Sequence, residues 1–290
     1  MTQRPPLFGT RNSLFRRAGL KLFRKINPGD ITIKHHWTGD RFSLHSFKHK
    51  GYWWHGKKRE LQTIQRFQRL ICPGDVVIEV GGHIGYFSIL YARLVGAAGK
   101  VFVFEPGDNN LPYIRRNLAG HANAEIIEKA VSDQNGIVKF WLEDLSGQNN
   151  SMVENYHLLE GNIALAGLGS DVHKREVQVP SITLDTFIEE IQSRGLSPNF
   201  IKIDVEGAEL FVLKGAKNLL SQRQVPLMVE VTCDAEPIFD LMTKAGYQMY
   251  FENGNELSSA ATMVGNIFCL PHRVWCERFN LAQEKPATHI

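Results

Sequence analysis

Residues 75–88 read DVVIEVGGHIGYFS and decide the fold, because an apolar strand runs here directly into a glycine-rich turn. The run 76–80 predicts the strand, and the pattern over 86–94 predicts a helix that follows it. The helix points its first amide donors toward the turn. The backbone can turn sharply and approach a ligand closely at three glycines, Gly81, Gly82 and Gly85.

The same alternation continues along the chain. Strands are predicted at 101–104, 125–130, 200–203 and 227–231, and helices at 109–118, 184–193, 208–220 and 237–245. Strands that alternate with helices form a parallel sheet. Two last apolar stretches, 247–251 and 264–270, predict an antiparallel pair at its end. The chain is therefore expected to be an α/β protein with a mostly parallel sheet.

Two parts of the chain differ from this alternation. Residues 1–59 predict a basic N-terminal extension with an amphipathic helix over 11–26 and a β-hairpin after it. The α/β domain then occupies 60–290. Within it, 143–180 is rich in Ser, Asn and Gly after an extra strand at 137–142, and predicts a long loop insertion that covers the site.

The composition is that of an ordinary globular protein. Hydrophobic residues make up 43% and charged residues 22% of 290 positions, enough to form a sizeable core. The four cysteines show neither paired ligand spacing nor the density of a disulfide scaffold, so no zinc site or disulfide frame is indicated. No apolar run approaches the roughly 20 residues of a membrane span. We therefore expect a cytoplasmic protein.

Positive charge is concentrated near the N-terminus. Residues 1–60 contain 14 Lys and Arg against three Asp and Glu (+11), which leaves 19 against 27 (−8) elsewhere. The helix over 11–26 is expected to bind an anionic membrane surface, which would place the protein peripherally at the inner membrane face. The alternative is that this helix packs on the protein's own core and its charges face water. Nucleic acid is not expected as a partner, because an RNA-binding signature is lacking outside 34–59.

Two glutamates end the strands beside the glycine turn. Glu79 lies two residues before the first glycine, where a carboxylate would repel a pyrophosphate but suits a cationic ligand with an amino group and a sulfonium. The glycine spacing also differs from the G-x-G-x-x-G pattern of dinucleotide sites. Glu105 follows the strand 101–104, where it can accept hydrogen bonds from both hydroxyls of a ribose. The alternative is that each acid only caps a helix.

A further acidic group occurs in FIKIDVEGAELFVLKGA, residues 200–216. An apolar strand here delivers Asp204 and Glu206 just before a glycine and a helix. Ligands of open α/β sheets bind outside the carboxyl ends of the strands, so these acids are well placed for function. Glu230 ends PLMVEV at the corresponding edge of the next strand. The alternative for Glu206 and Glu209 is that they only stabilise a helix N-terminus.

Five segments within residues 72–232 together resemble the FkbM family of methyltransferases, namely VIEVGGHIGYFS, VFVFEP, SITLDTF, FIKIDVEGAELFVLKGA and PLMVEV. The resemblance implies a Rossmann-like seven-stranded methyltransferase sheet with S-adenosylmethionine as cofactor. It also implies methyl transfer mainly to oxygen, often to hydroxyls of sugars or secondary metabolites. In this family an Asp is usual at the position of Glu79, and a histidine often stands at that of Thr232.

The resemblance also assigns the cofactor contacts. It implies that Glu79, Gly81 and Gly85 hold the methionine portion and that Glu105 holds the ribose. Either Ser132 or Asp133 would then lie at the adenine edge.

We expect the acceptor to be a small molecule or glycan that carries a hydroxyl, such as a sugar, glycolipid or secondary metabolite. The protein must align the acceptor oxygen and help remove its proton. The candidates for that help are Asp204, Glu206, Glu230 and His83. A carboxylate cluster that holds Mg²⁺ is an alternative.

Two functions of other classes stay open at this point. A nicotinamide-dependent oxidoreductase would use Glu105 equally well. A non-catalytic protein that docks on membranes could use the same fold. The sequence does not indicate an oligomeric state.

Overall fold

The computed structural model describes residues 28–154, 173–271 and 273–280. The predicted amphipathic helix over 11–26 lies outside the described residues, and so do residues 155–172 of the predicted loop insertion.

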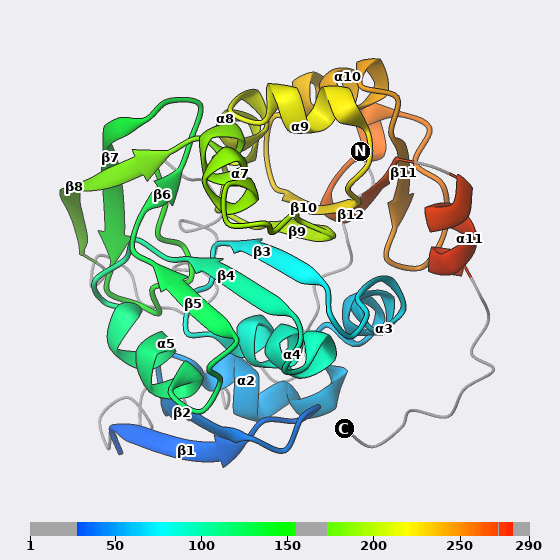
Figure 1. Ribbon diagram of the computed structural model, residues 1–290. Helices are drawn as coiled ribbons and strands as arrows, with labels where there is room; N and C mark the ends of the chain where they lie inside the picture. Colours follow the sequence, from blue (N-terminus) through cyan, green and yellow to red (C-terminus); the bar gives the residue numbers. More distant parts are fainter. Residues whose placement is uncertain (1–27, 155–172, 272, 281–290) are drawn as a thin grey trace, which may run out of the picture.

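A seven-stranded sheet forms the centre of the molecule, in the order β11-β12-β10-β9-β3-β4-β5 (Figure 1). Its strands are β3 (Val76–Val80), β4 (Lys100–Phe104), β5 (Ala124–Ile127), β9 (Phe200–Ile203), β10 (Leu227–Val231), β11 (Gln248–Phe251) and β12 (Gly265–Leu270). Neighbouring strands are parallel except at β12, which is antiparallel to both β10 and β11. This confirms the predicted Rossmann-like α/β sheet with an antiparallel terminal pair.

Helices cover both faces of this sheet (Figure 1). Successive strand residues point to opposite faces, so Ile78 belongs to one core and Val77 to the other. The first core includes residues of α7 (Leu184–Gln192), α8 (Glu209–Lys214), α9 (Lys217–Gln222) and α10 (Ala235–Lys244). The second includes residues of α3 (Leu61–Leu70), α4 (Tyr86–Val95), α5 (Leu111–Leu118) and α11 (Arg273–Asn280). The sheet is therefore buried on both sides, as its continuous apolar strands require.

The helix predicted over 208–220 is two helices, α8 and α9, which are separated at Gly215. A side chain at Gly215 would place its Cβ 2.1 Å from the carbonyl oxygen of Ser132. The break therefore lies where another segment of backbone approaches closely, and only glycine fits there.

A small second sheet, in the order β6-β8-β7, lies beside the main one. It consists of β6 (Ala130–Val131), β7 (Gly136–Glu143) and β8 (Lys174–Ile182). The extra strand predicted over 137–142 is present as part of β7. Part of the segment predicted as a loop, however, is the strand β8, which pairs antiparallel with β7 and sets Val177 opposite Phe140. The pairing partner, rather than any strong local pattern, makes this segment a strand.

The predicted hairpin is present as β1 (Asp30–Lys34) and β2 (Arg41–His45). Its apolar residues Phe42 and Leu44 are buried in the same core as α4 and α5. Asn117 of α5 fixes this contact, since its side chain accepts from the amide of Ser43 at 2.7 Å and donates to the Ser43 carbonyl at 2.9 Å. Two unpredicted helices, α2 (Lys50–His55) and η2 (Gly56–Lys58), follow the hairpin and lead into α3.

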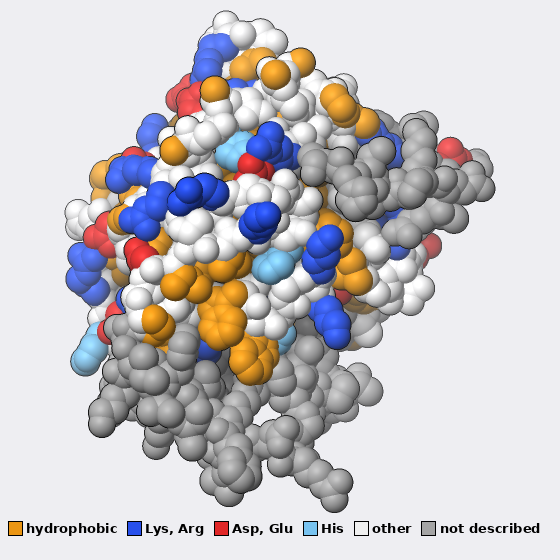
Figure 2. Space-filling model, turned by 90° about the horizontal axis from the view of Figure 1, so that it is seen from below, with side chains coloured by type: hydrophobic (Ala, Val, Ile, Leu, Met, Phe, Trp, Pro, Cys, Tyr) orange, Lys and Arg blue, Asp and Glu red, His pale blue; other side chains and the backbone are white. Residues whose placement is uncertain are grey.

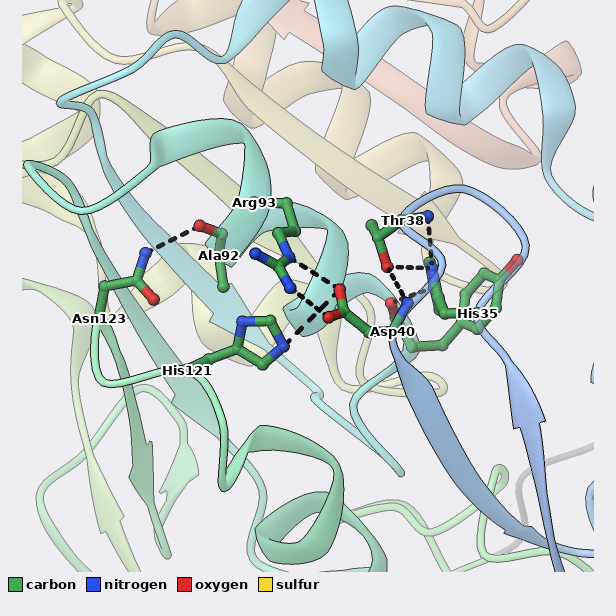
Figure 3. Close-up of polar contacts among 8 residues, drawn as sticks. His35, Thr38, Asp40, Ala92, Arg93, His121 and Asn123 are labelled. Carbon is green, nitrogen blue, oxygen red and sulfur yellow. Dashed lines mark hydrogen bonds and ion pairs between the residues drawn. The ribbon is translucent and has the colours of Figure 1, made fainter. Parts of the chain in front are cut away.

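Polar contacts also attach the hairpin turn to the α/β domain (Figure 3). Asp40 accepts hydrogen bonds from Arg93 of α4, and His121 lies 3.9 Å from the same carboxylate. His35 bonds the carbonyl oxygen of Tyr86 at 3.0 Å. The hairpin therefore has a fixed position relative to α4.

Figure 2 shows the face below the sheet, where Lys and Arg side chains lie beside exposed hydrophobic ones. Part of the predicted N-terminal charge lies on the hairpin and the helices after it, in Lys34, Arg41, Lys48, Lys57 and Lys58, all exposed. No helix within the described residues is long and apolar enough to cross a membrane.

Candidate active site

The chain reverses its direction of winding at one point in the main sheet. From β3 it continues to β4 and β5, whereas β9 and β10 lie on the other side of β3. Ligands of open α/β sheets bind outside the carboxyl ends of the strands at such a point. An open cavity lies there, with about 980 Å³ of space including its solvent-filled mouth. The candidate residues that line it are Glu79, Gly81, Gly82, His83, Glu105, Asp204, Glu206 and Glu230.

The cavity wall contains unusual backbone. Five described non-glycine residues have a left-handed φ, and three of them, Glu60 (52°), His83 (49°) and Glu206 (53°), line this cavity. Such conformations are unfavourable for residues with a Cβ and concentrate at functional sites. The backbone geometry therefore marks the same place as the topology.

The glycine turn packs tightly between two strands. A Cβ on Gly81, whose φ is 90°, would lie 1.8 Å from the Asp204 carbonyl oxygen. A Cβ on Gly82 would lie 2.3 Å from Cγ1 of Val103 in β4. Gly85, with a φ of 86°, precedes the first residue of α4 and lies outside the cavity lining. The glycines thus allow the turn to lie directly against the strand that carries Asp204.

Lys202 of β9 is the main residue that sequence reasoning missed. Its buried ammonium lies 2.9 Å from Oδ2 of Asp204 and 3.7 Å from Oε1 of Glu79, and it donates to the Gly81 carbonyl at 3.1 Å. Burial opposes its charge, but these two carboxylates raise the pKa of Lys202 overall. A signal was present, because a lysine inside a buried apolar strand needs a charged partner.

Asp204 and Glu230 form a hydrogen-bonded pair of carboxyl groups in the cavity. Burial acts to raise the pKa of Asp204, but the charge of Lys202 and the hydrogen bonds from Glu230 and Lys202 outweigh it and lower that pKa. The pKa of Glu230 is raised well above its ordinary value, first by the charge of Asp204 and then by burial. Asp204 is therefore the ionised member and Glu230 the protonated one.

Glu79 and Glu105 are both buried at the ends of their strands. Ser88 donates to Glu79 at 2.5 Å. Glu105 accepts from the amides of His83 at 2.7 Å and Gly107 at 2.8 Å. Burial raises the pKa of each glutamate to about 7. A cationic or hydroxyl-bearing ligand would stabilise both carboxylates, because it restores the interactions that they lose with water on burial.

His83 has both ring nitrogens engaged. The Tyr52 hydroxyl lies 3.0 Å from Nδ1, and the carbonyl oxygen of Ser146 lies 3.2 Å from Nε2. A carbonyl only accepts, so Nε2 carries the proton and Nδ1 accepts from Tyr52. Burial lowers the pKa of His83 to about 4. In this arrangement His83 joins α2 and the segment after β7 to the glycine turn, and it has no free nitrogen for an acceptor's proton.

The predicted adenine contacts do not line the cavity. Ser132 is buried and bonds Asp133, with 3.2 Å between Ser132 Oγ and Oδ1 of Asp133. The cavity wall near them is formed instead by Lys129, Ala130 and Val131, together with Phe104, Phe140 and Met152. These mostly apolar side chains give a surface suited to a flat purine ring.

The donor set fits S-adenosylmethionine. Buried carboxylates at Glu79 and Glu105 match its cationic methionine portion and its ribose hydroxyls. The apolar wall beside Ala130 and Val131 suits its adenine. No group of three or more His, Cys, Asp or Glu suited to a metal ion occurs among residues 28–154, 173–271 and 273–280.

Comparison with known proteins identifies the family of this chain. The family described as "Methyltransferase FkbM domain" matches residues 79–249, which is more than half of the chain. The chain belongs to the FkbM methyltransferase family. Membership confirms the predicted family and its cofactor, S-adenosylmethionine. It also favours a methyltransferase over the nicotinamide-dependent alternative.

Two curated relatives have more specific names. The 31-O-demethyl-FK506 methyltransferase FkbM of Streptomyces tacrolimicus is 31% identical over half of this chain and 61% of its own length. The hexuronic acid methyltransferase AglP of Haloferax volcanii is 26% identical over 62% of this chain and 66% of its own length. The chain thus spans about six tenths of the length of these relatives.

Among solved structures, the methyltransferase FkbM of Methylobacillus flagellatus is similar with a TM-score of 0.43 and 14% identity. The likeness covers 71% of this chain and 50% of that one.

Proposed function

We propose that this FkbM-family protein transfers a methyl group from S-adenosylmethionine to a hydroxyl oxygen, with Asp204 as the group that receives the hydroxyl's hydrogen bond. The observation that carries the proposal is the 2.9 Å contact between Lys202 and Asp204 at the carboxyl end of β9. This contact keeps the partly exposed Asp204 carboxylate ionised inside the cavity, where a weakly acidic hydroxyl needs an acceptor for its proton.

The neighbouring residues have distinct roles in this proposal. S-adenosylmethionine supplies an already activated methyl group. Glu79 faces its positively charged methionine portion, and Glu105 accepts hydrogen bonds from its ribose. Gly81 and Gly82 allow the turn to pack closely against β9 and β4, so that the cofactor lies close to Asp204. Positioning of this kind is a large part of catalysis of a bimolecular transfer.

Glu230 completes the acid–base arrangement. Because Glu230 is protonated and hydrogen-bonded to Asp204, it fixes the orientation of the ionised carboxylate. The pair can then hold the proton that leaves the acceptor hydroxyl. Glu206, with its carbonyl bonded by Ser151 at 2.7 Å, ties the segment after β7 to the cavity edge and stays a candidate for contact with the acceptor.

The names of the two relatives support an acceptor that carries hydroxyl groups. One is named for 31-O-demethyl-FK506 and the other for a hexuronic acid. We therefore propose a hydroxyl of a sugar, glycolipid or secondary metabolite as the methylated group.

Titration calorimetry tests the cofactor part of this proposal. The protein is titrated with S-adenosylmethionine, with its demethylated product S-adenosylhomocysteine, and with NADH. We expect the first two to bind and NADH not to bind. Binding of NADH alone would overturn the proposal and restore the oxidoreductase alternative.

A further inference from the structure

Arg59 is a cation in the lining of the cavity, and the proposed chemistry does not use it. It lies in the short connection between η2 and α3, directly before Glu60, whose φ is 52°. Its guanidinium carbon lies 4.4 Å from the centroid of the Tyr52 ring. Arg59 and Tyr52 both line the cavity. Tyr52 in turn bonds His83, so Arg59 is held beside the glycine turn.

The hydrogen-bonding capacity of this guanidinium is not used. Its planar fork presents five N–H donors. Within residues 28–154, 173–271 and 273–280, no hydrogen bond or ion pair of 4.0 Å or less joins it to an acceptor. Burial acts to lower the pKa of Arg59, but the Tyr52 oxygen, followed by the Glu60 carboxylate, outweighs it and raises that pKa. A half-buried guanidinium without an acceptor lacks the partner that such groups normally have.

The other cations of the cavity differ from Arg59. Lys202 has its ammonium occupied by Asp204, Glu79 and the Gly81 carbonyl. Lys129 lies next to Ala130, on the wall assigned to adenine. Among the described lining residues, Arg59 is therefore the cation available to an acceptor.

We infer that Arg59 binds an anionic oxygen group, a carboxylate or a phosphate, on the acceptor. The inference rests on the proposed function, since it takes the cavity beside Asp204 as the acceptor site. A guanidinium fork matches both oxygens of such a group, and stacking on Tyr52 holds the fork in one plane. The acceptor class is then an acidic hydroxyl compound, such as a uronic acid or a sugar phosphate, rather than a neutral one.

The test compares matched probes by calorimetry, on the free protein and on the protein saturated with S-adenosylhomocysteine. The probes are D-glucuronate, its neutral amide D-glucuronamide, and D-glucose 6-phosphate. Hydrogen bonds to a charged group predict that at least one anion binds about tenfold or more tightly than the amide. Arg59→Gln should abolish that preference, whereas Lys58→Gln, which removes a neighbouring exposed charge, should keep it.

Two further measurements separate the possible failures. Arg59→Lys retains the charge without the fork and should show a reduced preference. Melting temperature and S-adenosylhomocysteine affinity should stay near those of the parent in all three variants. The inference would be overturned if neither anion binds more tightly than the amide, or if the preference for an anion survives in Arg59→Gln. In either case, binding of S-adenosylhomocysteine by the parent protein would still support the proposed function. If the parent protein does not bind S-adenosylhomocysteine, the proposed function itself is refuted.

Discussion

The ammonium of Lys202 lies 2.9 Å from Asp204, and the same ammonium lies 3.7 Å from Glu79 on the adjacent strand. One lysine therefore compensates two carboxylates, the buried Glu79 assigned to the cofactor and the partly exposed Asp204 assigned to the acceptor. This arrangement joins the acceptor half and the cofactor half of the site.

Lys202→Met should destabilise the fold strongly. Removing one partner of a buried ion pair typically costs about 3 to 5 kcal/mol of the free energy of unfolding, because the other charge stays uncompensated. The pKa of Asp204 is lowered in the folded protein, so its stabilising effect exists above its ordinary value of 3.8 and is lost as the pH falls below it. The loss should thus be large at neutral pH and shrink in acid. Urea unfolding measures it.

The matched control is Lys214→Met, which removes an exposed lysine from α8. We expect it to change the free energy of unfolding by less than about 0.5 kcal/mol. Equal effects of the two substitutions would show that Lys202 does not compensate Asp204 and Glu79.

Stability and cofactor affinity should respond to pH in opposite directions. Burial raises the pKa of both Glu79 and Glu105 from 4.5 to about 7 in the folded protein. Groups with a raised pKa stabilise the fold below the unfolded value, and that contribution is lost as the pH rises through the folded value. The free protein should therefore lose stability between pH 4.5 and about 7. Thermal unfolding across this range checks the sign.

S-adenosylmethionine, with its extra sulfonium charge, favours the ionised glutamates. Its affinity relative to S-adenosylhomocysteine should rise between about pH 6 and 8, while the amino group shared by both ligands cancels in the ratio. A ratio that does not change with pH would contradict the placement of Glu79 beside the sulfonium.

Glu105→Gln should weaken cofactor binding at least about tenfold, because hydrogen bonds to a charged group contribute roughly 1.5 to 3 kcal/mol each. Asp108→Asn is the control, since Asp108 lies on the same loop but pairs with exposed Arg175. Circular dichroism verifies folding and calorimetry gives the affinity. Parent-like binding by Glu105→Gln would remove the ribose role.

Asp40→Ala should loosen the hairpin that leads to Tyr52 and Arg59. A hydrogen bond from Arg93 lowers the pKa of Asp40 to about 2, so the contact stabilises the fold above 3.8 and is lost as the pH falls toward 2. The pair is partly exposed, so we expect a loss of only about 1 kcal/mol at neutral pH. Arg115→Ala, which breaks a more exposed pair with Glu128, should cost less. We expect faster hydrogen exchange at the hairpin amides of Asp40→Ala. An unchanged exchange rate would show that Asp40 does not hold the hairpin in place.

The main sheet could be predicted from the sequence because its information is local. Apolar runs such as 76–80 and 200–203 give strands, and acids directly after them share one edge of a parallel sheet. That reasoning brought Glu79, Glu105 and Asp204 together correctly. The sequence left two roles open for Glu209. In the structure the Glu209 carboxylate accepts a hydrogen bond from the amide of Gly207 at 2.9 Å, and Glu209 lies outside the cavity lining.

The remaining parts of the site depend on contacts between distant segments. The charge of Lys202 is compensated by Glu79 only because β9 pairs with β3. Tyr52 reaches His83 only because the hairpin docks on α4 and α5. No local pattern encodes such pairings, so the sequence offered His83 only as one candidate base and did not indicate Lys202, Arg59 or the hydrogen bond between Tyr52 and His83.

The most direct test of the central claim is methyl transfer by the parent protein and Asp204→Asn, measured by mass spectrometry with deuterated-methyl S-adenosylmethionine and cell extract. Asp240→Asn, an exposed acid of α10, is the control. We predict labelled products one methyl group heavier from the parent and Asp240→Asn. Asp204→Asn should bind S-adenosylhomocysteine as the parent does, but its rate of methyl transfer should fall by about 100-fold or more. Parent-like labelling by Asp204→Asn, or no labelled product from the parent, would contradict the account.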